Sequence, residues 1–293
     1  MKTFRKLIVL ILVLVSSLQA AVADVVVFSY NRPIQLYAFL ESAENLMTGA
    51  GEVHVIYRAD TQELSAGYDV VAHDFDYVIF HKQGSDPRGD FKPLTMRATF
   101  ESPSEYIIFA VDDIIVKDFC NLSDCIDQLE RHHAYGFYLR MGRNLTWCYS
   151  WNQKQNLPAM KEVAPGLFTW KFSEGTHDWN YPHSVDMTLL RKRDIRSNFD
   201  RLSFSNPNTL EGYWANLAGP IMNRLGLCYE KTKIVNVPLN RVQSTWANRN
   251  MELYTPEELL TFFNEGKKID IEPLFQWDNP GAHSEYEPTF IAR

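Results

Sequence analysis

The sequence has few cysteines, no excess of positive charge and, beyond its first residues, no long apolar run. Four cysteines in 293 residues are too few for the disulfide-dense scaffold of a small secreted domain. A formal net charge of −7 argues against nucleic acid as a partner, because binding a polyanion requires a positive surface. No internal repeat or low-complexity linker divides the chain, and its length suits one large core. The sequence therefore predicts one globular domain that does not bind nucleic acid.

The N-terminus has the pattern of a targeting segment. A basic start is followed by an apolar run over residues 7–15 and then by the small residues of Ala21-Val-Ala23, which is the order found in signal peptides. We therefore expect a signal peptide over residues 1–23, and a single domain over residues 24–293 that is exported or enters the lumen of the secretory pathway. The apolar run is short for a membrane span. The alternative is an uncleaved anchor formed by residues 7–23, which would attach the protein to a membrane.

Strand and helix patterns alternate over the first ~115 residues. Short apolar runs predict strands at 25–30, 53–57, 77–80 and 106–111, and helices from Pro33 and over 91–101. This order predicts an α/β fold with a doubly wound, mostly parallel sheet and helices on both faces. Further along, we expect helices at 123–131 and 210–218, strands at 135–140 and 184–190, and a last helix that starts at the capping box of Thr255. Residues 147–180 show no clear period.

Two adjacent carboxylates, Asp112 and Asp113, stand where a buried strand ends. Ligands of open α/β sheets bind at the carboxyl ends of the strands. Neighbouring carboxylates repel each other and are costly to desolvate unless a cation or hydrogen-bond donors offset them. A hard cation that also contacts diphosphate oxygens, Mg²⁺ or Mn²⁺, would meet this need. The alternative is a solvated turn in which both side chains face water.

Two short motifs carry a resemblance to a known family. Phe28-Ser-Tyr-Asn-Arg-Pro33 and Phe109-Ala-Val-Asp-Asp-Ile114 together resemble the GT-A class of nucleotide-sugar-dependent glycosyltransferases. The resemblance implies that the first strand and its turn, including Asn31, hold the nucleotide of the donor. It also implies an Asp-x-Asp-type element that binds Mn²⁺ or Mg²⁺, with Asp113 as the main metal ligand and Asp112 touching the metal or the donor sugar. The chain departs from the full pattern because Ala110 and Val111 stand where an acidic residue often precedes the pair.

Three basic residues are candidates for binding the donor phosphates. Arg32 lies where a helix N-terminus would also present backbone donors to an anion, and its alternative role is a surface salt bridge. Lys92 and Arg97 lie just upstream of the strand that ends at Asp112. Cations on a helix are more often simply solvated.

The C-terminal half resembles the acceptor side of such enzymes through Tyr181–Met187 and Phe204–Trp214. Glu211, near the start of a helix, and Asp186 are the candidate catalytic carboxylates, which orient an acceptor hydroxyl or remove its proton. A first-turn Glu is also favoured by the helix dipole alone, and Asp186 has a buried structural role as its alternative. His183 is a candidate third metal ligand, although a lone His is more often structural.

The resulting hypothesis is a glycosyltransferase, hexosyl or related, that moves a sugar from a nucleoside-diphosphate donor to a glycan or other hydroxyl acceptor. Two alternatives remain open. One is a catalytically inactive nucleotide- or sugar-binding protein of the same fold, which the incomplete acidic motif suggests. The other is an exported metal-dependent hydrolase, although the chain has no Ser-His or paired-Glu signature. Donor, acceptor and stereochemistry are not fixed by the sequence.

Overall fold

The computed structural model describes residues 21–293. Nearly all of the expected signal segment lies outside these residues, and the expected cleavage point falls at Ala23, the first residue of strand β1. Within the described residues, no helix combines the length and apolar character needed to cross a membrane.

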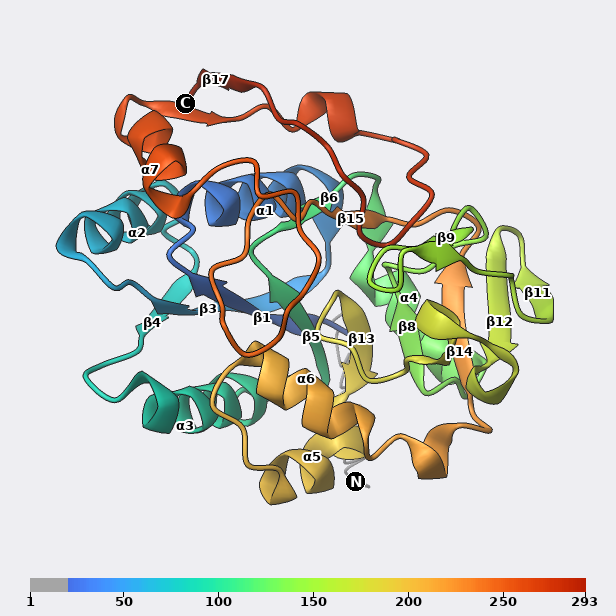
Figure 1. Ribbon diagram of the computed structural model, residues 1–293. Coiled ribbons are helices and arrows are strands. Elements are labelled where there is room, and N and C mark those ends of the chain that lie inside the picture. Colours follow the sequence, from blue (N-terminus) through green and yellow to red (C-terminus); the bar gives the residue numbers. More distant parts are fainter. Residues whose placement is uncertain (1–20) are drawn as a thin grey trace, which may run out of the picture.

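A mixed central sheet runs through the molecule (Figure 1). Among residues 21–293, its strands in spatial order are β11 (Met160–Ala164), β12 (Leu167–Lys171), β14 (Leu225–Tyr229), β8 (Gly136–Tyr138), β13 (Thr188–Arg191), β5 (Tyr106–Val111), β1 (Ala23–Tyr30), β3 (Ala50–Arg58) and β4 (Ile79–Lys82). The N-terminal strands β5, β1, β3 and β4 are all parallel to one another. Strand β13 then pairs antiparallel with β5 and joins the C-terminal strands to this parallel half.

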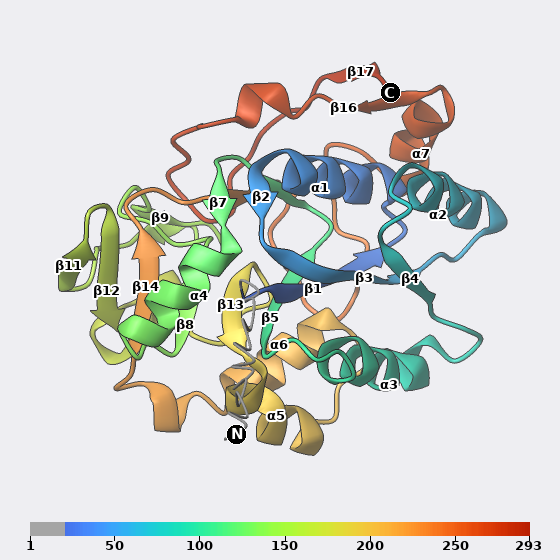
Figure 2. The same ribbon diagram turned by 180° about the vertical axis from the view of Figure 1, so that it is seen from behind.

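Helices cover both faces of the sheet, as the sequence predicts (Figures 1 and 2). The helices are α1 (Pro33–Leu46), α2 (Gln62–Asp74), α3 (Pro87–Phe100), α4 (Leu122–Arg131), α5 (Lys192–Arg201), α6 (Pro207–Ala215) and α7 (Pro256–Asn264). One core cluster contains apolar residues of α1, α2, α4 and α7, and the other those of α3, α5 and α6. The α/β class with helices on both faces is confirmed.

In the described part of the chain, four pairs of short strands lie outside the main sheet and join segments that connect its strands and helices. They are β2 (Met47–Thr48) with β7 (Cys120–Asn121), β6 (Ile114–Val116) with β15 (Ile234–Asn236), β9 (Trp147–Cys148) with β10 (Gln153–Lys154), and β16 (Lys267–Ile269) with β17 (Phe290–Ala292). The β6–β15 pair brings residues more than a hundred positions apart beside the turn between β5 and β6.

The structure differs from the sequence expectations in a few elements. Helices α2 and α5 were not expected, and α3 begins at Pro87 because the Asp86 side chain accepts a hydrogen bond from the Gly89 amide. The expected strand at 184–190 begins only at Thr188. Its first residues form a buried turn that ends at Met187, whose φ of 55° lies in the left-handed region.

Candidate active site

The site begins at the turn between β5 and β6, which holds Asp112 and Asp113. Asp112 is almost fully buried and all of its contacts are internal. One carboxylate oxygen accepts hydrogen bonds from the Ser29 hydroxyl (2.8 Å) and the Tyr30 amide (3.2 Å). The other accepts from Nη1 of Arg32 at 3.0 Å. Asp112 therefore ties the end of β1 to the start of α1, and both of its oxygens already have protein donors.

Asp113 is the carboxylate of the pair that has capacity left for a ligand. Its Oδ1 accepts a hydrogen bond from the Asn236 amide at 3.3 Å, and its Oδ2 lies 3.5 Å from Nη1 of Arg32. Burial raises the pKa of Asp113 to about 6; Arg32 opposes this shift and Asp112 adds to it. Asp113 is buried and its one arginine partner lies at a long distance, so its negative charge is only partly neutralised. Asp113 is thus suited to bind a cation in the cavity that it lines.

Arg32 is a buried structural cation at the N-terminus of α1. Besides Asp112, its guanidinium donates to the side-chain oxygen of Asn240 (2.9 Å) and to the Asn240 carbonyl (2.5 Å). Asn31, with φ of 55°, exchanges hydrogen bonds with Asp60. Its side chain therefore holds the turn after β1 against the loop after β3. Arg32 was expected from the sequence to bind the donor phosphates; it lines the cavity, and its three hydrogen bonds are to Asp112 and Asn240.

A second pair of carboxylates, Glu211 and Asp186, lines the same cavity. The Val185 amide donates to Oε1 of Glu211 at 3.0 Å. Burial, with Asp186 adding, raises the pKa of Glu211 to about 7. A carboxyl group that titrates near neutrality can accept or release a proton under ordinary conditions. Glu211 therefore has the properties of a general base.

The helix that carries Glu211 is fixed by its N-cap. Asn206 accepts a hydrogen bond from the Thr209 amide (2.8 Å), and the Thr209 hydroxyl accepts from the Asn206 amide (3.1 Å), which completes a capping box. We expect Asn206→Ala to lower the free energy of unfolding by about 1 kcal/mol, measured by urea denaturation. Asn206→Asp keeps the cap and serves as the matched control. Equal losses in both variants would contradict the capping role.

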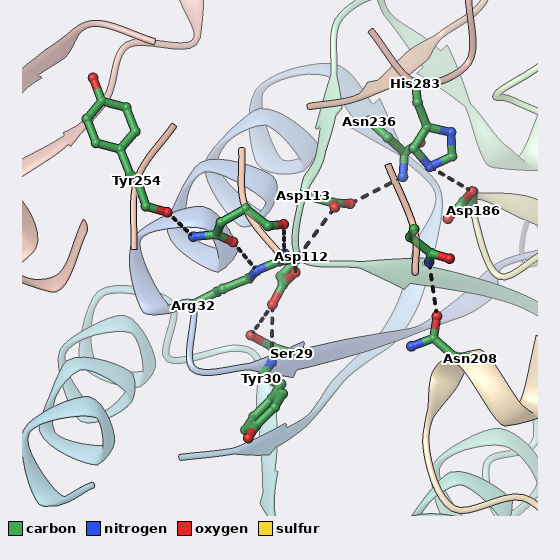
Figure 3. A network of polar contacts seen from close by, with 12 residues as sticks. Ser29, Tyr30, Arg32, Asp112, Asp113, Asp186, Asn208, Asn236, Tyr254 and His283 are labelled. Carbon is green, nitrogen blue, oxygen red and sulfur yellow. Dashed lines mark hydrogen bonds and ion pairs between the residues drawn. The ribbon is translucent and has the colours of Figure 1, made fainter. Parts of the chain in front are cut away.

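Both acidic pairs line one cavity of about 620 Å³ at the carboxyl ends of the parallel strands. The segment between β15 and α7 contributes residues 238, 240–245 and 247–250 to the lining of this cavity. Figure 3 shows Asp113, Asn236, Asp186 and His283 grouped around the same region. A cavity of this volume is in the range of sites for small molecules and cofactors.

Positive side chains lie at the wall and mouth of the cavity. The arginines among its lining residues, besides Arg32 and Arg140, are Arg58, Arg88, Arg241 and Arg249. Arg88 and Arg241 are exposed, and within residues 21–293 no ion pair holds their guanidinium groups. Arginine suits the recognition of phosphate oxygens, so these two side chains are placed to meet an anionic ligand that enters the cavity.

Three of the predicted site residues do not fit their expected roles. Both ring nitrogens of His183 are engaged, by the Tyr135 hydroxyl (2.9 Å) and the Trp214 carbonyl (2.7 Å). Burial lowers the pKa of His183 to about 4. This histidine has no free nitrogen for a metal and does not line the cavity, so we correct the expectation of a third metal ligand.

Lys92 and Arg97 lie on α3 away from the cavity. The ammonium group of Lys92 donates to the carbonyls of Asp200 and Leu202, and so links α3 to the end of α5. Arg97 is exposed and approaches only Glu101 among acidic side chains of the described residues. Neither residue is placed to bind the donor phosphates, because α3 presents other residues, Pro87, Arg88 and Phe91, to the cavity.

Tertiary structure adds residues that the sequence did not single out. Asn236 reaches Asp113 from β15, and His283 comes from the C-terminal segment, which pairs with Asn236 through an isolated bridge. The His283 ring nitrogen Nε2 lies 3.9 Å from Asp186. Arg140 follows β8 and also lines the cavity. The only signal for Arg140 was its place at the end of an expected strand, and the polar tail had no signal for His283.

A curated glycosyltransferase is similar to this chain in sequence. No known protein-family model matches the chain. The bifunctional glycosyltransferase pgtA of Dictyostelium discoideum is 24% identical over 258 residues, which are 76% of this chain and 33% of the relative. The chain thus spans about a third of the length of this curated relative. The resemblance to glycosyltransferases expected from the sequence is confirmed by this similarity.

Solved glycosyltransferase structures are also similar. S. aureus TarS 1-349 in complex with UDP is 15% identical, with a TM-score of 0.48 over 73% of this chain and 59% of that one. The mannosyltransferase PcManGT from Pyrobaculum calidifontis, in complex with GDP-Man and Mn²⁺, is 10% identical, with a TM-score of 0.39 over 70% and 53%. Mouse xyloside xylosyltransferase 1 is 14% identical, with a TM-score of 0.37 over 69% and 83%. Because each TM-score is below 0.5, we take the fold class from the strand order and pairing of the chain itself.

Proposed function

We propose that this chain is a glycosyltransferase that moves a sugar from a nucleoside-diphosphate donor to a hydroxyl acceptor. The observation that carries the proposal is the arrangement of two carboxylate pairs around one cavity at the carboxyl ends of parallel strands. The negative charge of Asp113 is only partly neutralised within the protein, and the pKa of Glu211 is raised to about 7. Asp113 thus suits a cation with a diphosphate, and Glu211 suits an acceptor hydroxyl.

The donor side fits Mn²⁺ or Mg²⁺. Within residues 21–293, no cluster of three or more His, Cys, Asp or Glu side chains forms a complete metal cage. These hard cations, however, usually bind through one or two carboxylates together with substrate phosphates and water. Asp113 would supply the carboxylate. When bound, such a cation supplies positive charge that stabilises the departing diphosphate. Arg88 and Arg241 would contact the remaining phosphate oxygens.

On the acceptor side, Glu211 would remove the proton of the attacking hydroxyl. The Val185 amide holds one of its oxygens, and this fixes the direction of the carboxyl group. Asp186, close enough to raise the pKa of Glu211, would orient the acceptor. This assignment corresponds to an inverting reaction, because a retaining one does not require such a base.

We also propose that this protein is located in the lumen of the secretory pathway or outside the cell. The basis is the order of basic, apolar and small residues over positions 1–23. Nucleotide sugars are supplied to the lumen of a eukaryotic secretory organelle, which makes this location compatible with the proposed activity.

The proposal is tested by nucleotide binding. We expect one nucleoside diphosphate from a panel of UDP, GDP and CDP to raise the melting temperature of the protein when Mn²⁺ is present. Asp113→Asn should lose this metal-dependent shift because it removes the charge that holds the cation. Asp200→Asn, an exposed aspartate on α5, is the matched control and should behave as the wild type.

Two outcomes would contradict the donor site. One is the absence of any nucleotide-dependent shift in folded wild-type protein, and the other is a full shift in Asp113→Asn. Turnover of the matching nucleotide sugar then separates an enzyme from an inactive binding protein. Release of free sugar without any acceptor product would favour the hydrolase.

A further inference from the structure

Trp151 is the most exposed tryptophan of the chain, and it lines the cavity. Its exposed fraction is 69%, against 50% for Trp246, which is the next most exposed tryptophan. Trp151 is among the residues that line the cavity, and Trp246 is not. An exposed indole leaves a large apolar ring in contact with water. Because this ring stands beside a cavity that also contains carboxylates, it is accessible to a ligand that enters the cavity.

A tight hairpin fixes the backbone of Trp151. Strands β9 and β10 pair antiparallel, with Gln153 opposite Cys148. Between them the Asn152 amide donates a hydrogen bond to the Tyr149 carbonyl at 3.0 Å. Asn152 has a φ of 50°, in the left-handed region that asparagine tolerates, and this conformation lets the chain reverse direction. Trp151 therefore lies in a closed turn, so its exposed side chain is presented from a defined backbone.

A series of contacts connects Trp151 with the carboxylate pair proposed to bind the acceptor. The indole ring lies beside the ring of His177, with the two ring centroids 6.1 Å apart. The next residue along the chain is Asp178, which lies 3.9 Å from Nη1 of Arg140. The same nitrogen lies 3.7 Å from Asp186, one member of the carboxylate pair. Trp151 is therefore linked through neighbouring side chains to the acceptor carboxylates.

Polar side chains surround this indole. Ser150, His177 and Asp178 all line the cavity. The Gln153 amide donates to Nε2 of His177 at 3.0 Å, and the Gln155 amide donates to Asp178 at 3.0 Å. A pyranose ring has C–H groups on its face and hydroxyls on its edge. The C–H groups suit the negative face of an aromatic ring, and the hydroxyls suit side chains that donate and accept hydrogen bonds. The surroundings of Trp151 offer both.

A nucleobase is the other flat group that stacks well on an indole. The charges near Trp151 argue against it, because the donor base carries a diphosphate that needs positive charge. The arginine that contacts this turn, Arg249, already pairs with Glu285 at 2.9 Å. Asp178 adds a negative charge beside His177. An uncharged saccharide meets no such repulsion, so the observations favour a sugar ring.

We propose that the acceptor is a saccharide, and that one of its pyranose rings stacks on the indole of Trp151 while its hydroxyls bind to the neighbouring polar side chains. This inference rests on the proposed function, because it names the class of the hydroxyl acceptor. A serine or threonine side chain and an open-chain polyol lack a ring face, and they are excluded as the group that binds at Trp151.

The test measures the binding of glycosides to the full chain. The probes are the methyl glycosides of glucose, galactose, mannose and N-acetylglucosamine, with sorbitol as a polyol that has no ring. Each is added with and without Mn²⁺ and UDP, GDP or CDP, and binding is followed by saturation-transfer NMR and tryptophan fluorescence. We expect at least one glycoside to bind and sorbitol not to bind. Trp151→Leu, which keeps an apolar side chain but has no aromatic face, should weaken that binding by about tenfold.

Two further variants separate stacking from folding. Trp151→Phe keeps a smaller aromatic face and should lose less binding than Trp151→Leu. Phe119→Ala is the matched control, because Phe119 is 55% exposed and is not among the residues that line the cavity, and it should bind as the wild type does. Circular dichroism reports whether each variant is folded, and if Trp151→Leu is not, the partial loss in Trp151→Phe decides the outcome.

Three results would overturn the inference. They are undiminished glycoside binding in folded Trp151→Leu, binding of sorbitol as tight as that of the glycosides, and no glycoside bound by folded wild type. Loss of nucleotide binding in folded Trp151→Leu with glycoside binding unchanged belongs to the first of these, and it would show that the indole binds the nucleobase.

Nucleotide binding in the same samples distinguishes this inference from the proposed function. A nucleoside diphosphate that binds with Mn²⁺, while the binding of no glycoside depends on Trp151, would overturn the saccharide acceptor alone. Glycoside binding that depends on Trp151, with no nucleotide bound under any condition, would overturn the nucleotide-sugar donor and leave the saccharide site at Trp151.

Discussion

Glu211→Gln is expected to lower the turnover number for glycosyl transfer by about 10²–10⁴-fold, while the protein stays folded. The amide keeps the shape of the side chain but cannot accept the proton of the acceptor hydroxyl. The measurement is a steady-state assay with the nucleotide sugar and acceptor that support turnover. Glu287→Gln changes an exposed glutamate far along the chain and serves as the matched control.

The pH dependence follows from the same carboxyl group. The pKa of Glu211 is raised to about 7, and the deprotonated form is the base, so wild-type turnover should rise as pH passes through about 7. Glu211→Gln should lack this rise. Turnover unchanged in Glu211→Gln but lost in Asp186→Asn would contradict the assignment and make Asp186 the base.

The raised pKa also makes a prediction for stability. In the folded state Glu211 keeps its proton above the pH at which an unfolded glutamate releases it. The folded state then binds more protons, and the free energy of unfolding should fall as pH rises from about 4.5 toward 7. The fall should be smaller in Glu211→Gln, which has no such proton. Urea denaturation across this range measures the difference.

Arg32→Met is expected to lower the free energy of unfolding by about 3–5 kcal/mol, because it leaves Asp112 and Asp113 buried without their internal cation. Urea denaturation at neutral pH measures the loss. Arg58→Met is the control: its arginine is more exposed and pairs with Asp60 on the surface, so its loss should be below about 1 kcal/mol.

A second substitution tests the cause of this loss. Adding Asp112→Asn to Arg32→Met removes one of the two uncompensated charges, so the double variant should be more stable than the sum of the single losses predicts. Simple additivity would contradict electrostatic coupling. A loss below about 1 kcal/mol in Arg32→Met alone would show that donors other than Arg32 offset the pair.

The sequence by itself determined the parallel half of the sheet and the place of the acidic pair. The buried runs that became β1, β3 and β5 are short, apolar and bounded by turn residues, so their character is local and can be recognised without tertiary contacts. The strand-end position of Asp112 and Asp113 follows directly from them. Glu211 was identifiable because an Asn-Pro turn precedes its helix.

Only the tertiary structure decided which side chains share the cavity. Arg140, Asn236 and His283 come from segments far apart in the sequence. Arg140 follows β8, Asn236 ends β15, which pairs with β6, and His283 pairs with Asn236 through an isolated bridge. Packing also makes His183 unavailable as a metal ligand, because its two ring nitrogens are engaged by Tyr135 and Trp214. Local pattern fixes whether a residue lies at the end of a strand or in a helix. Its partners depend on long-range contacts, which no local pattern encodes.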